Sequence, residues 1–439
     1  MGAAPGLTRA HGRAHNRAGD VVSTGGSMGT RAGTASGNDT DAYRLGRETM
    51  RAALAAGSLD RADLVLAFCS GASDAGRFLG GIREVAGPAV PVIGGSAAGI
   101  ITQDAISCEG APAAVAAIAS DRIRFTVAAA GDLDLDEAAA GRRLADALAD
   151  TAAARLLLLF YDSIRVPASP EAPPALNASA PLLAGLSAGL GAGVPVIGAG
   201  LLAGFDFGPT RQFDGRGVVD RHAVGCLVGG GCAVDHAIMH GCIPVDGIYR
   251  RITRIAGDVI HELDGRSFPE LLDEAFGNRD WRQERPVIMS LALAVDCGPR
   301  FGPPREQNFA GRLLTGVTPA GDGIGMFEAD LSVGDEVRFM VRDNRLMLRS
   351  VRENTPRLLD RVRAAGREPF LALYIDCGGR SSRFSLTDRE EAAEVQQVLR
   401  EAGIPLLGFY SGVEIAPLAG RSRGLDWTGV LVLLSEEKR

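Results

Sequence analysis

Pro405-Leu406-Leu407-Gly408-Phe409-Tyr410-Ser411-Gly412 is one of three stretches with the same plan, in which a proline and branched aliphatic residues lead into small residues. The other two are Pro91-Val92-Ile93-Gly94-Gly95-Ser96 and Pro195-Val196-Ile197-Gly198-Ala199-Gly200. Each follows an earlier apolar run that ends on a polar or sulfur residue, at residues 64–70, 156–163 and 371–377. Continuous apolar runs of this length predict strands buried on both faces, and the segments between them suit crossover helices. We therefore expect repeated βαβ units whose second strand exits through glycine.

Alternating segments predict antiparallel additions to these units. Residues 113–119 and 123–129, joined by Ser120-Asp121-Arg122, predict one hairpin, and residues 250–262 predict another that turns at Gly257-Asp258. A strand over residues 346–351 is expected to precede a helix that begins at Thr355-Pro356. We predict an α/β fold with two related domains, as from an internal duplication, whose mixed sheets are built from repeated βαβ units plus antiparallel hairpins.

Length and composition suggest where the domains begin and end. A chain of 439 residues exceeds what one hydrophobic core usually supports. Residues 1–40 are rich in small residues and arginine and offer few large apolar side chains, so we expect a disordered N-terminal segment there. The rest of the chain is predicted to form a first domain over residues 41–246 and a second over residues 247–439.

Charge and composition exclude several classes of protein. A net charge of −7 argues against nucleic acid or an anionic membrane as the main partner. The 46 basic residues include a single lysine, Lys438, which excludes a Walker P-loop and a pyridoxal Schiff base. Seven cysteines without a closely spaced pair suit reduced thiols, and no stretch has the pattern of a membrane span or a signal peptide. We expect a cytoplasmic protein that needs no cofactor.

A turn and a glycine-rich segment in the last third of the chain resemble those of a known family. Cys377-Gly378-Gly379-Arg380 and the segment from Gly408 to Glu414 resemble the C-terminal domain of the FIST family, and residues 64–70 and 91–99 resemble its N-terminal domain. The resemblance implies a bacterial sensory module that binds small ligands, such as amino acids, and it does not imply catalysis. No kinase, cyclase or DNA-binding segment follows the second domain, so we expect output through a separate signalling protein.

The predicted ligand site lies at the turn that follows residues 371–377. An arginine at the end of a strand can fix a ligand carboxylate with two parallel hydrogen bonds, and a neighbouring thiol can line the pocket. Glu414 can pair with a ligand amine or with Arg380 itself. The predicted ligand-binding residues are Cys377, Gly379, Arg380, Gly408, Tyr410, Gly412 and Glu414, with Cys69, Ser70 and Ser96 at an equivalent N-terminal site.

Cys377 also supports an alternative, a thiol-dependent enzyme that acts on a small metabolite. Such a nucleophile needs a base that forms the thiolate, and the candidate bases are His222, His236, His240 and His261. His236 and His240 are not expected to bind a metal together, because on a strand they would lie about 13 Å apart. The sequence therefore predicts no metal site and leaves sensor and enzyme open.

Overall fold

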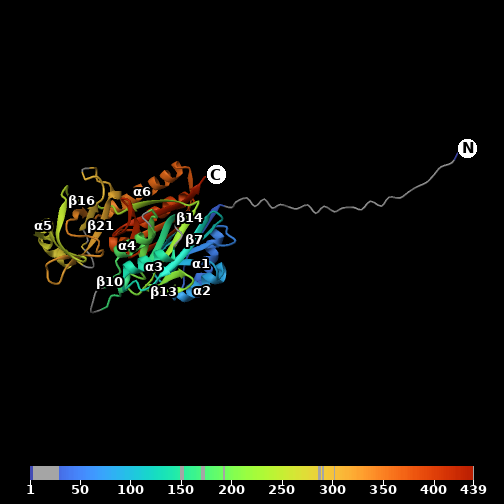
Figure 1. Cartoon of the computed structure of the whole chain (residues 1–439), viewed down its shortest axis with the longest axis horizontal. Coiled ribbons are helices and arrows are strands. Elements are labelled where there is room, and N and C mark those ends of the chain that lie inside the picture. Colours follow the sequence, from blue (N-terminus) through green and yellow to red (C-terminus); the bar gives the residue numbers. More distant parts are fainter. Residues whose placement is uncertain are drawn as a thin grey trace.

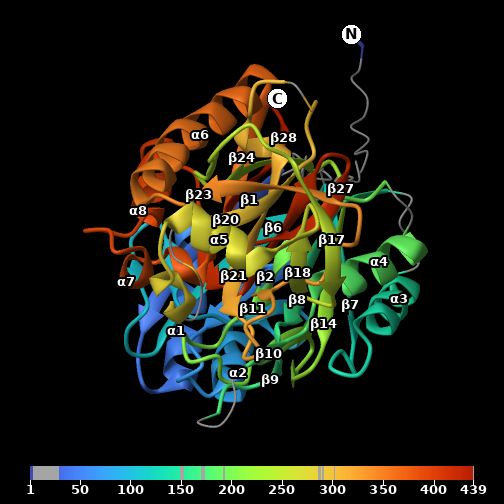
Figure 2. The same ribbon diagram turned by 90° about the vertical axis from the view of Figure 1, so that its left-hand side faces the viewer.

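The computed structural model describes residues 1–2, 29–148, 153–169, 174–190, 193–284, 288, 291–300 and 302–438. These residues form a body of three six-stranded mixed sheets, with a smaller barrel of strands at one end (Figure 1). Seen from that end, the barrel lies in front of the body, and helices cover the outside of the sheets (Figure 2). The predicted α/β class with mixed sheets is confirmed.

The body consists of three repeats of one succession of elements. Each repeat contains two parallel strands joined through a helix, β2 with β3, β8 with β11 and β24 with β25, so the three predicted βαβ units are all present. The first repeat comprises β1 (Thr30–Asn38), α1 (Ala42–Ala56), β2 (Leu64–Cys69), α2 (Ala75–Ala86), β3 (Val92–Ser96), β4 (Ile100–Thr102), β5 (Ile106–Ser107) and β6 (Pro112–Ser120).

The other two repeats follow the same order with different additions. The second comprises β7 (Ile123–Ala130), α3 (Glu137–Ala147), β8 (Ala154–Asp162), β9 (Ile164–Val166), β10 (Ala175–Leu176), α4 (Ser179–Leu190), β11 (Val196–Leu201), β12 (Gln212–Gly215), β13 (Val218–Val219) and β14 (Ala223–Gly230). The third comprises β15 (Ala233–Met239), α6 (Asn344–Ala364), β24 (Arg367–Cys377), α7 (Ser382–Ser385), α8 (Ala392–Glu401), β25 (Leu406–Ser411), β26 (Val413–Leu418), β27 (Arg421–Leu425) and β28 (Gly429–Glu437).

Each repeat lends a hairpin to the sheet of another repeat. The sheet orders are β1-β6-β2-β3-β12-β13, β7-β14-β8-β11-β26-β27 and β15-β28-β24-β25-β4-β5. The hairpin β4–β5 thus completes the third sheet, β12–β13 completes the first and β26–β27 completes the second. Because each sheet takes strands from two repeats, the three repeats are interlocked. The domain boundary at residue 247 is not tested by this arrangement and stays a prediction.

The three sheets share one apolar core, and helix pairs cover their outer faces. Phe68, Phe160 and Phe409 meet in this core, with ring centroids 3.9 Å apart for Phe68 and Phe409 and 5.3 Å apart for Phe68 and Phe160. On the outside, α1 and α2 cross closely because Gly81 lacks a side chain, and a methyl group there would lie 2.0 Å from the carbonyl oxygen of Tyr43. These buried faces explain the continuous apolar runs in the sequence.

The barrel is inserted into the third repeat, between β15 and α6. It has its own apolar core, in which Phe268 and Phe339 stack with centroids 6.0 Å apart. Pairing of β20 with β23 closes it. Its elements are β16 (Ile243–Pro244), β17 (Arg250–Ala256), β18 (Val259–Leu263), β19 (Arg266–Ser267), α5 (Phe268–Phe276), η1 (Asp280–Gln283), β20 (Leu291–Asp296), η2 (Glu306–Asn308), β21 (Phe309–Val317), β22 (Ile324–Met326) and β23 (Glu336–Val341).

Some local predictions are confirmed and others are wrong. The hairpin over residues 250–262 is present as β17–β18. Residues 113–129 do not form a hairpin, because β6 pairs with β1 and β2 whereas β7 pairs with β14. Residues 346–351 are not a strand: α6 is one helix from Asn344, capped by the Asp343 carboxylate, with Pro356 inside it. Residues 30–38 form β1 and are not disordered, whereas residues 3–28 of the predicted disordered segment lie outside the described residues.

Candidate functional site

A cavity of about 300 Å³ lies between the barrel and the carboxyl ends of β11, β24 and β25. Ligands of open α/β sheets commonly bind beyond the carboxyl ends of strands. The body contributes the residues that follow these strands, the barrel contributes one wall, and α7 contributes Phe384. The lining residues are Leu176, Leu202, Phe205, Phe207, Leu313, Phe327, Arg342, Cys377, Gly378, Gly379, Phe384, Ser411, Gly412, Asp426 and Trp427.

Five of the fifteen lining residues are aromatic. Phe205 and Phe384 meet edge to face, with centroids 5.0 Å apart, and they come from the loop after β11 and from α7. Trp427 is 4% exposed and occupies the turn between β27 and β28. The η3 turn (Gly378–Arg380) approaches its indole closely, because a methyl group at Gly379 would lie only 3.2 Å from Trp427 Cζ3. Such a wall suits an apolar or aromatic ligand body.

Arg342 brings a buried positive charge to this apolar cavity. It follows β23, is 6% exposed, and lies over the Trp427 ring with its guanidinium carbon 3.8 Å from the centroid. Its Nη1 donates to the carbonyl of Ile288 at 2.8 Å, while Nε and Nη2 are buried without a hydrogen-bond partner among the described residues. Trp427 Nε1 is in the same condition. Burial lowers the pKa of Arg342 to about 10, so the guanidinium remains charged at neutral pH.

Asp426 is the carboxylate of the cavity. Its Oδ2 accepts from the Leu313 backbone N–H at 2.9 Å. Burial raises the pKa of Asp426 to about 6, and the Arg312 guanidinium opposes this rise. Asp426 and Arg342 line the same cavity. No ion pair joins the two side chains within the described part of the chain. A cavity with a cation and an anion that are not paired with each other is complementary to a zwitterion.

Cys377 lines the cavity but is not an activated thiol. Burial, with a further contribution from the Glu414 carboxylate, raises the pKa of the Cys377 thiol well above its usual range. A nucleophilic cysteine needs the opposite shift, because the thiolate is the reactive form. Among the other predicted ligand residues, Gly379 and Gly412 also line the cavity.

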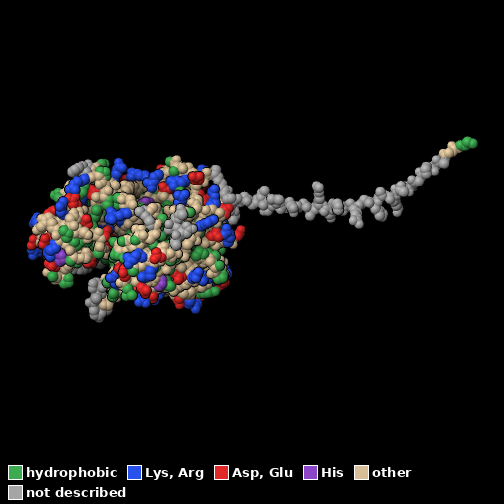
Figure 3. Space-filling view, in the orientation of Figure 1, with side chains coloured by type: hydrophobic (Ala, Val, Ile, Leu, Met, Phe, Trp, Pro, Cys, Tyr) green, Lys and Arg blue, Asp and Glu red, His purple; other side chains and the backbone are tan. Residues whose placement is uncertain are grey.

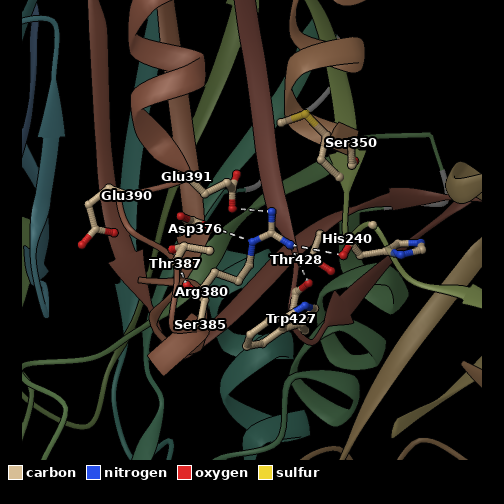
Figure 4. Close-up of polar contacts among 12 residues, drawn as sticks. His240, Ser350, Asp376, Arg380, Ser385, Thr387, Glu390, Glu391, Trp427 and Thr428 are labelled. Atoms are coloured by element: carbon tan, nitrogen blue, oxygen red, sulfur yellow. Dashed lines mark hydrogen bonds and ion pairs between the residues drawn. The ribbon is translucent and has the colours of Figure 1, made fainter. Parts of the chain in front are cut away.

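The structure places Arg380 away from the cavity and corrects its predicted role. Arg380 is 0% exposed and forms ion pairs with Asp376 at 3.0 Å and Glu391 at 2.5 Å (Figure 4). Its Nη1 donates to the carbonyls of Trp427 and His240, at 3.1 and 3.4 Å. Burial alone would lower the pKa of Arg380. The Glu391 and Asp376 carboxylates outweigh this effect and raise the pKa of Arg380 well above its usual range. The guanidinium is thus committed to the protein interior and is not free for a ligand carboxylate.

Glu414, Tyr410 and Gly408 are also occupied within the protein. The Glu414 carboxylate accepts from Ser411 Oγ at 2.8 Å and from the Thr428 backbone N–H at 3.2 Å, and no ion pair joins it to Arg380 in the described part of the chain. The Tyr410 hydroxyl donates to Glu390 Oε2 at 2.6 Å. Gly408 lies inside the sheet, between β24 and β4. Among the predicted loop amides, the Gly412 N–H donates to the carbonyl of Gly200 at 2.9 Å. This backbone amide therefore makes a structural hydrogen bond.

The predicted N-terminal site residues do not line this cavity either. Cys69 and Ser96 end the paired strands β2 and β3, both buried, and burial raises the pKa of Cys69 to about 12. Ser96 Oγ accepts from the Arg211 backbone N–H at 2.9 Å. Ser70 Oγ accepts from the Ala72 backbone N–H at 3.2 Å. These contacts fix the ends of β2 and β3, so these side chains have a structural role.

No group of three His, Cys, Asp or Glu side chains within the described ranges has the geometry of a metal site. His236 and His240 lie in and after β15, and each uses Nε2 in a contact with a backbone carbonyl, of Pro417 and of Glu306. No helix in the described part of the chain is both long and apolar enough to cross a membrane.

Comparison with protein families identifies the relatives of this fold. A model of the FIST N domain matches residues 63–266, and a model of the FIST C domain matches residues 269–417. The chain belongs to the FIST family. FIST domains are generally sensory domains of signal transduction. The resemblance to this family seen in the sequence is thereby confirmed.

Curated relatives of this FIST protein are mycobacterial. An uncharacterized protein of Mycobacterium tuberculosis (strain CDC 1551 / Oshkosh), MT0656, is 30% identical over 242 residues, which is 55% of this chain and 61% of the relative. The uncharacterized protein Mb0898c of Mycobacterium bovis is 29% identical over 247 residues, 56% of this chain and 61% of the relative. The match thus spans about three fifths of the length of these relatives.

Solved structures share less with this chain. A cyanuric acid hydrolase from A. caulinodans aligns with a TM-score of 0.33 and 11% identity over 93% of this chain and 100% of the other. PurLQS from Thermotoga maritima aligns with a TM-score of 0.20 and 10% identity over 93% of this chain and 73% of the other. Likeness at this level carries no argument about function.

Proposed function

We propose that this FIST protein is a sensor that binds a small carboxylate, such as an amino acid, in the cavity between the barrel and the body. The single observation that carries the proposal is Arg342, a buried guanidinium on the wall of an apolar cavity whose Nε and Nη2 have no hydrogen-bond partner among the described residues. Unpaired buried charges are costly, so they are usually retained where a ligand pairs with them.

Each part of an amino acid has a complementary group in the cavity. Nε and Nη2 of Arg342 suit the carboxylate, since a guanidinium can present two parallel donors. Asp426 suits the ammonium group, and the aromatic wall with Phe205 and Trp427 suits an apolar side chain. Cys377, Gly379 and Gly412 complete the wall near the turn. Arg342 takes in this proposal the role that the sequence assigned to Arg380.

The proposed role is binding without conversion of the ligand, in a cytoplasmic protein that signals through a separate protein partner. The raised pKa of Cys377 gives no support to a thiol-dependent enzyme. The cavity volume of about 300 Å³ is at the small end of ligand pockets, which span roughly 300 to 1,000 Å³. A metabolite of amino-acid size is therefore favoured over a nucleotide or a peptide.

A thermal-shift screen against amino acids and small carboxylates tests the proposal. A ligand at a hundred times its dissociation constant stabilises the folded state by about 2.7 kcal/mol, which gives a measurable shift. Arg342→Gln should weaken a ligand found in the screen by roughly tenfold or more, because a charged hydrogen bond contributes about 1.5 to 3 kcal/mol. Arg216→Gln removes an exposed arginine elsewhere and should leave binding unchanged.

Three results would contradict the proposal. A ligand that binds Arg342→Gln as tightly as the unaltered protein would remove Arg342 from the site. Chemical conversion of the ligand during incubation would indicate an enzyme. If no compound of the panel raises the melting temperature of the unaltered protein, the cavity does not bind small carboxylates.

A further inference from the structure

The outer face of α6 carries a ridge of positive charge on a chain whose net charge is −7. The helix has six arginines and two acidic residues over its 21 residues. Arg345, Arg349, Arg357 and Arg361 lie at multiples of four residues, so they form a row that turns slowly around the helix, by about 40° for every four residues. Figure 3 shows basic side chains gathered along the edge of the molecule where α6 lies in Figure 1.

A groove runs beside this ridge. It consists of two adjoining hollows of about 710 and 250 Å³ that share the lining residues Gln307, Asn354 and Arg357. The arginines of α6 that line it run from Arg349 to Arg361, which are twelve residues apart, or about 18 Å at 1.5 Å per residue. An extended peptide of about five residues spans that distance at roughly 3.3 Å per residue. We call this surface the α6 groove.

The positive charges of the α6 groove are only partly balanced. Arg349 and Arg357 share one carboxylate, Glu353, at 3.9 and 3.1 Å, and the two arginine side chains are 63% and 67% exposed. Across the groove, Arg305 is exposed and has no ion pair among the described residues. The surface therefore retains unneutralised guanidinium groups, to which an acidic partner is complementary.

The floor of the groove already binds a carboxylate, which belongs to Glu306 of the protein itself. Its Oε1 accepts from the backbone N–H groups of His240 and Gly241, both at 2.5 Å. Ser350 Oγ donates to the same carboxylate at 2.7 Å, and Asn354 Nδ2 donates at 3.0 Å. These donors fix the wall between the barrel loop and α6. Glu306 is thus satisfied within the protein, and the exposed Arg349 and Arg357, which share Glu353, lie beside it on α6.

Apolar side chains distinguish this surface from a nucleic-acid site. Ile243 is 45% exposed and lines the groove beside Pro244. The acidic Glu353 and Asp246 also line it, but each is already paired with an arginine of the protein, Arg357 and Arg250 respectively, whereas Arg305 has no ion pair among the described residues. A peptide that alternates carboxylates with apolar residues matches both features.

We propose that the α6 groove is the docking site for an extended, acidic segment of a partner protein. The carboxylates of the segment pair with Arg349, Arg357 and Arg305, and its apolar side chains cover Ile243. This surface is separate from the ligand cavity, so the proposal does not depend on the identity of the ligand.

Binding of a defined peptide tests the proposal. The probe is a fluorescein-labelled twelve-residue peptide of repeated Glu-Leu-Glu, added to the full-length protein at low salt and followed by fluorescence anisotropy. We expect saturable binding that weakens as salt is added, because exposed charges are screened. The double variant Arg349→Gln/Arg357→Gln should bind at least tenfold more weakly. The double variant Arg216→Gln/Arg363→Gln removes the same charge outside the groove and should bind within twofold of the unaltered protein.

The other outcomes would overturn the proposal. Equal losses in the two double variants would show attraction to overall charge only. Tighter binding of a single-stranded DNA of twelve nucleotides than of the peptide would indicate a nucleic-acid site. Absence of peptide binding to the unaltered protein would remove the groove as a docking site for acidic segments. Melting temperatures of both variants should stay close to that of the unaltered protein, since all four arginines are exposed.

Discussion

Glu328→Gln should change how the stability of this protein depends on pH. Glu328 is 1% exposed at the junction of the barrel and the second repeat, and its Oε1 accepts only from the Ser179 backbone N–H at 3.3 Å. Its Oε2 has no hydrogen-bond partner among the described residues. The nearby Arg312 guanidinium is already paired with Asp330. Burial raises the pKa of Glu328 to about 7, Arg312 opposes the rise and Asp426 adds to it.

The pKa of Glu328 in the unfolded and in the folded state determines how stability changes with pH. In the unfolded chain Glu328 ionises near its ordinary pKa of 4.5, whereas in the folded protein it ionises near 7. Between these values the unfolded state releases the proton first, so folding loses stability as the pH rises from about 4.5 to 7. A difference of two and a half pKa units corresponds to about 3 kcal/mol at 1.36 kcal/mol per unit. Glutamine cannot ionise and should not lose this free energy.

Urea unfolding at pH 4.5 and pH 8, followed by fluorescence, measures the effect. The stability of Glu328→Gln relative to the unaltered protein should rise by about 3 kcal/mol between the two pH values. Asp426 also contributes less stability as the pH rises through this range, and the part of this effect that does not depend on Glu328 cancels in the comparison because Asp426 is present in both proteins. Glu270→Gln, at an exposed position of α5, is the matched control and should show no such change. If Glu328→Gln and the unaltered protein respond to pH alike, within about 0.5 kcal/mol, the account of the buried carboxylate is wrong.

Two further predictions concern the turn after β24. Arg380→Ala should destabilise the fold by about 3 to 5 kcal/mol in urea unfolding, because it leaves Asp376 and Glu391 buried without their cation. A loss below about 1 kcal/mol would contradict the structural role of this ion-pair cluster. Cys377 should react with iodoacetamide at pH 7.5 far more slowly in the folded protein than in urea, since burial favours the thiol. Faster labelling of the folded protein would instead restore the enzyme alternative.

The sequence predicts the strands well because burial on both faces leaves a local signal. Residues 64–69 are apolar throughout and residues 406–411 are mostly apolar, and in the structure every residue of β2 and β25 is buried. Strand partners leave no such signal. The hairpin β4–β5 pairs with β25, about 300 residues away in the chain, because each repeat lends a hairpin to another sheet. The expected hairpin at residues 113–129 fails because β6 ends the first repeat and β7 begins the second, and each strand pairs within its own repeat.

The difference between Arg380 and Arg342 is also beyond local patterns. Both arginines follow a strand, but the sequence predicts a ligand contact only for Arg380, which follows the apolar residues 371–375. The acid that neutralises Arg380 through a second ion pair, Glu391, is eleven residues away, and only the fold brings it close. Asp376, four residues before Arg380, is the one local warning. The role of Arg342 is missed for another reason. Proline is common at the first position of a helix, so Pro356 predicts a helix that starts there and leaves residues 346–351 as a strand. In the structure Pro356 lies inside α6, which starts at Asn344, two residues after Arg342.

The position of Arg342 connects the two proposed surfaces. Arg342 is followed directly by Asp343, the residue that caps α6, and the arginines of the α6 groove begin within the first two turns of that helix. A ligand paired with Arg342 would therefore act next to the start of the element that bears the groove. Helix α6 is also packed on the third sheet through Val351, Leu358 and Val362, so it moves as a unit or not at all. If ligand occupancy is to reach a partner on the groove, α6 is the shortest physical route, because it carries one surface and adjoins the other.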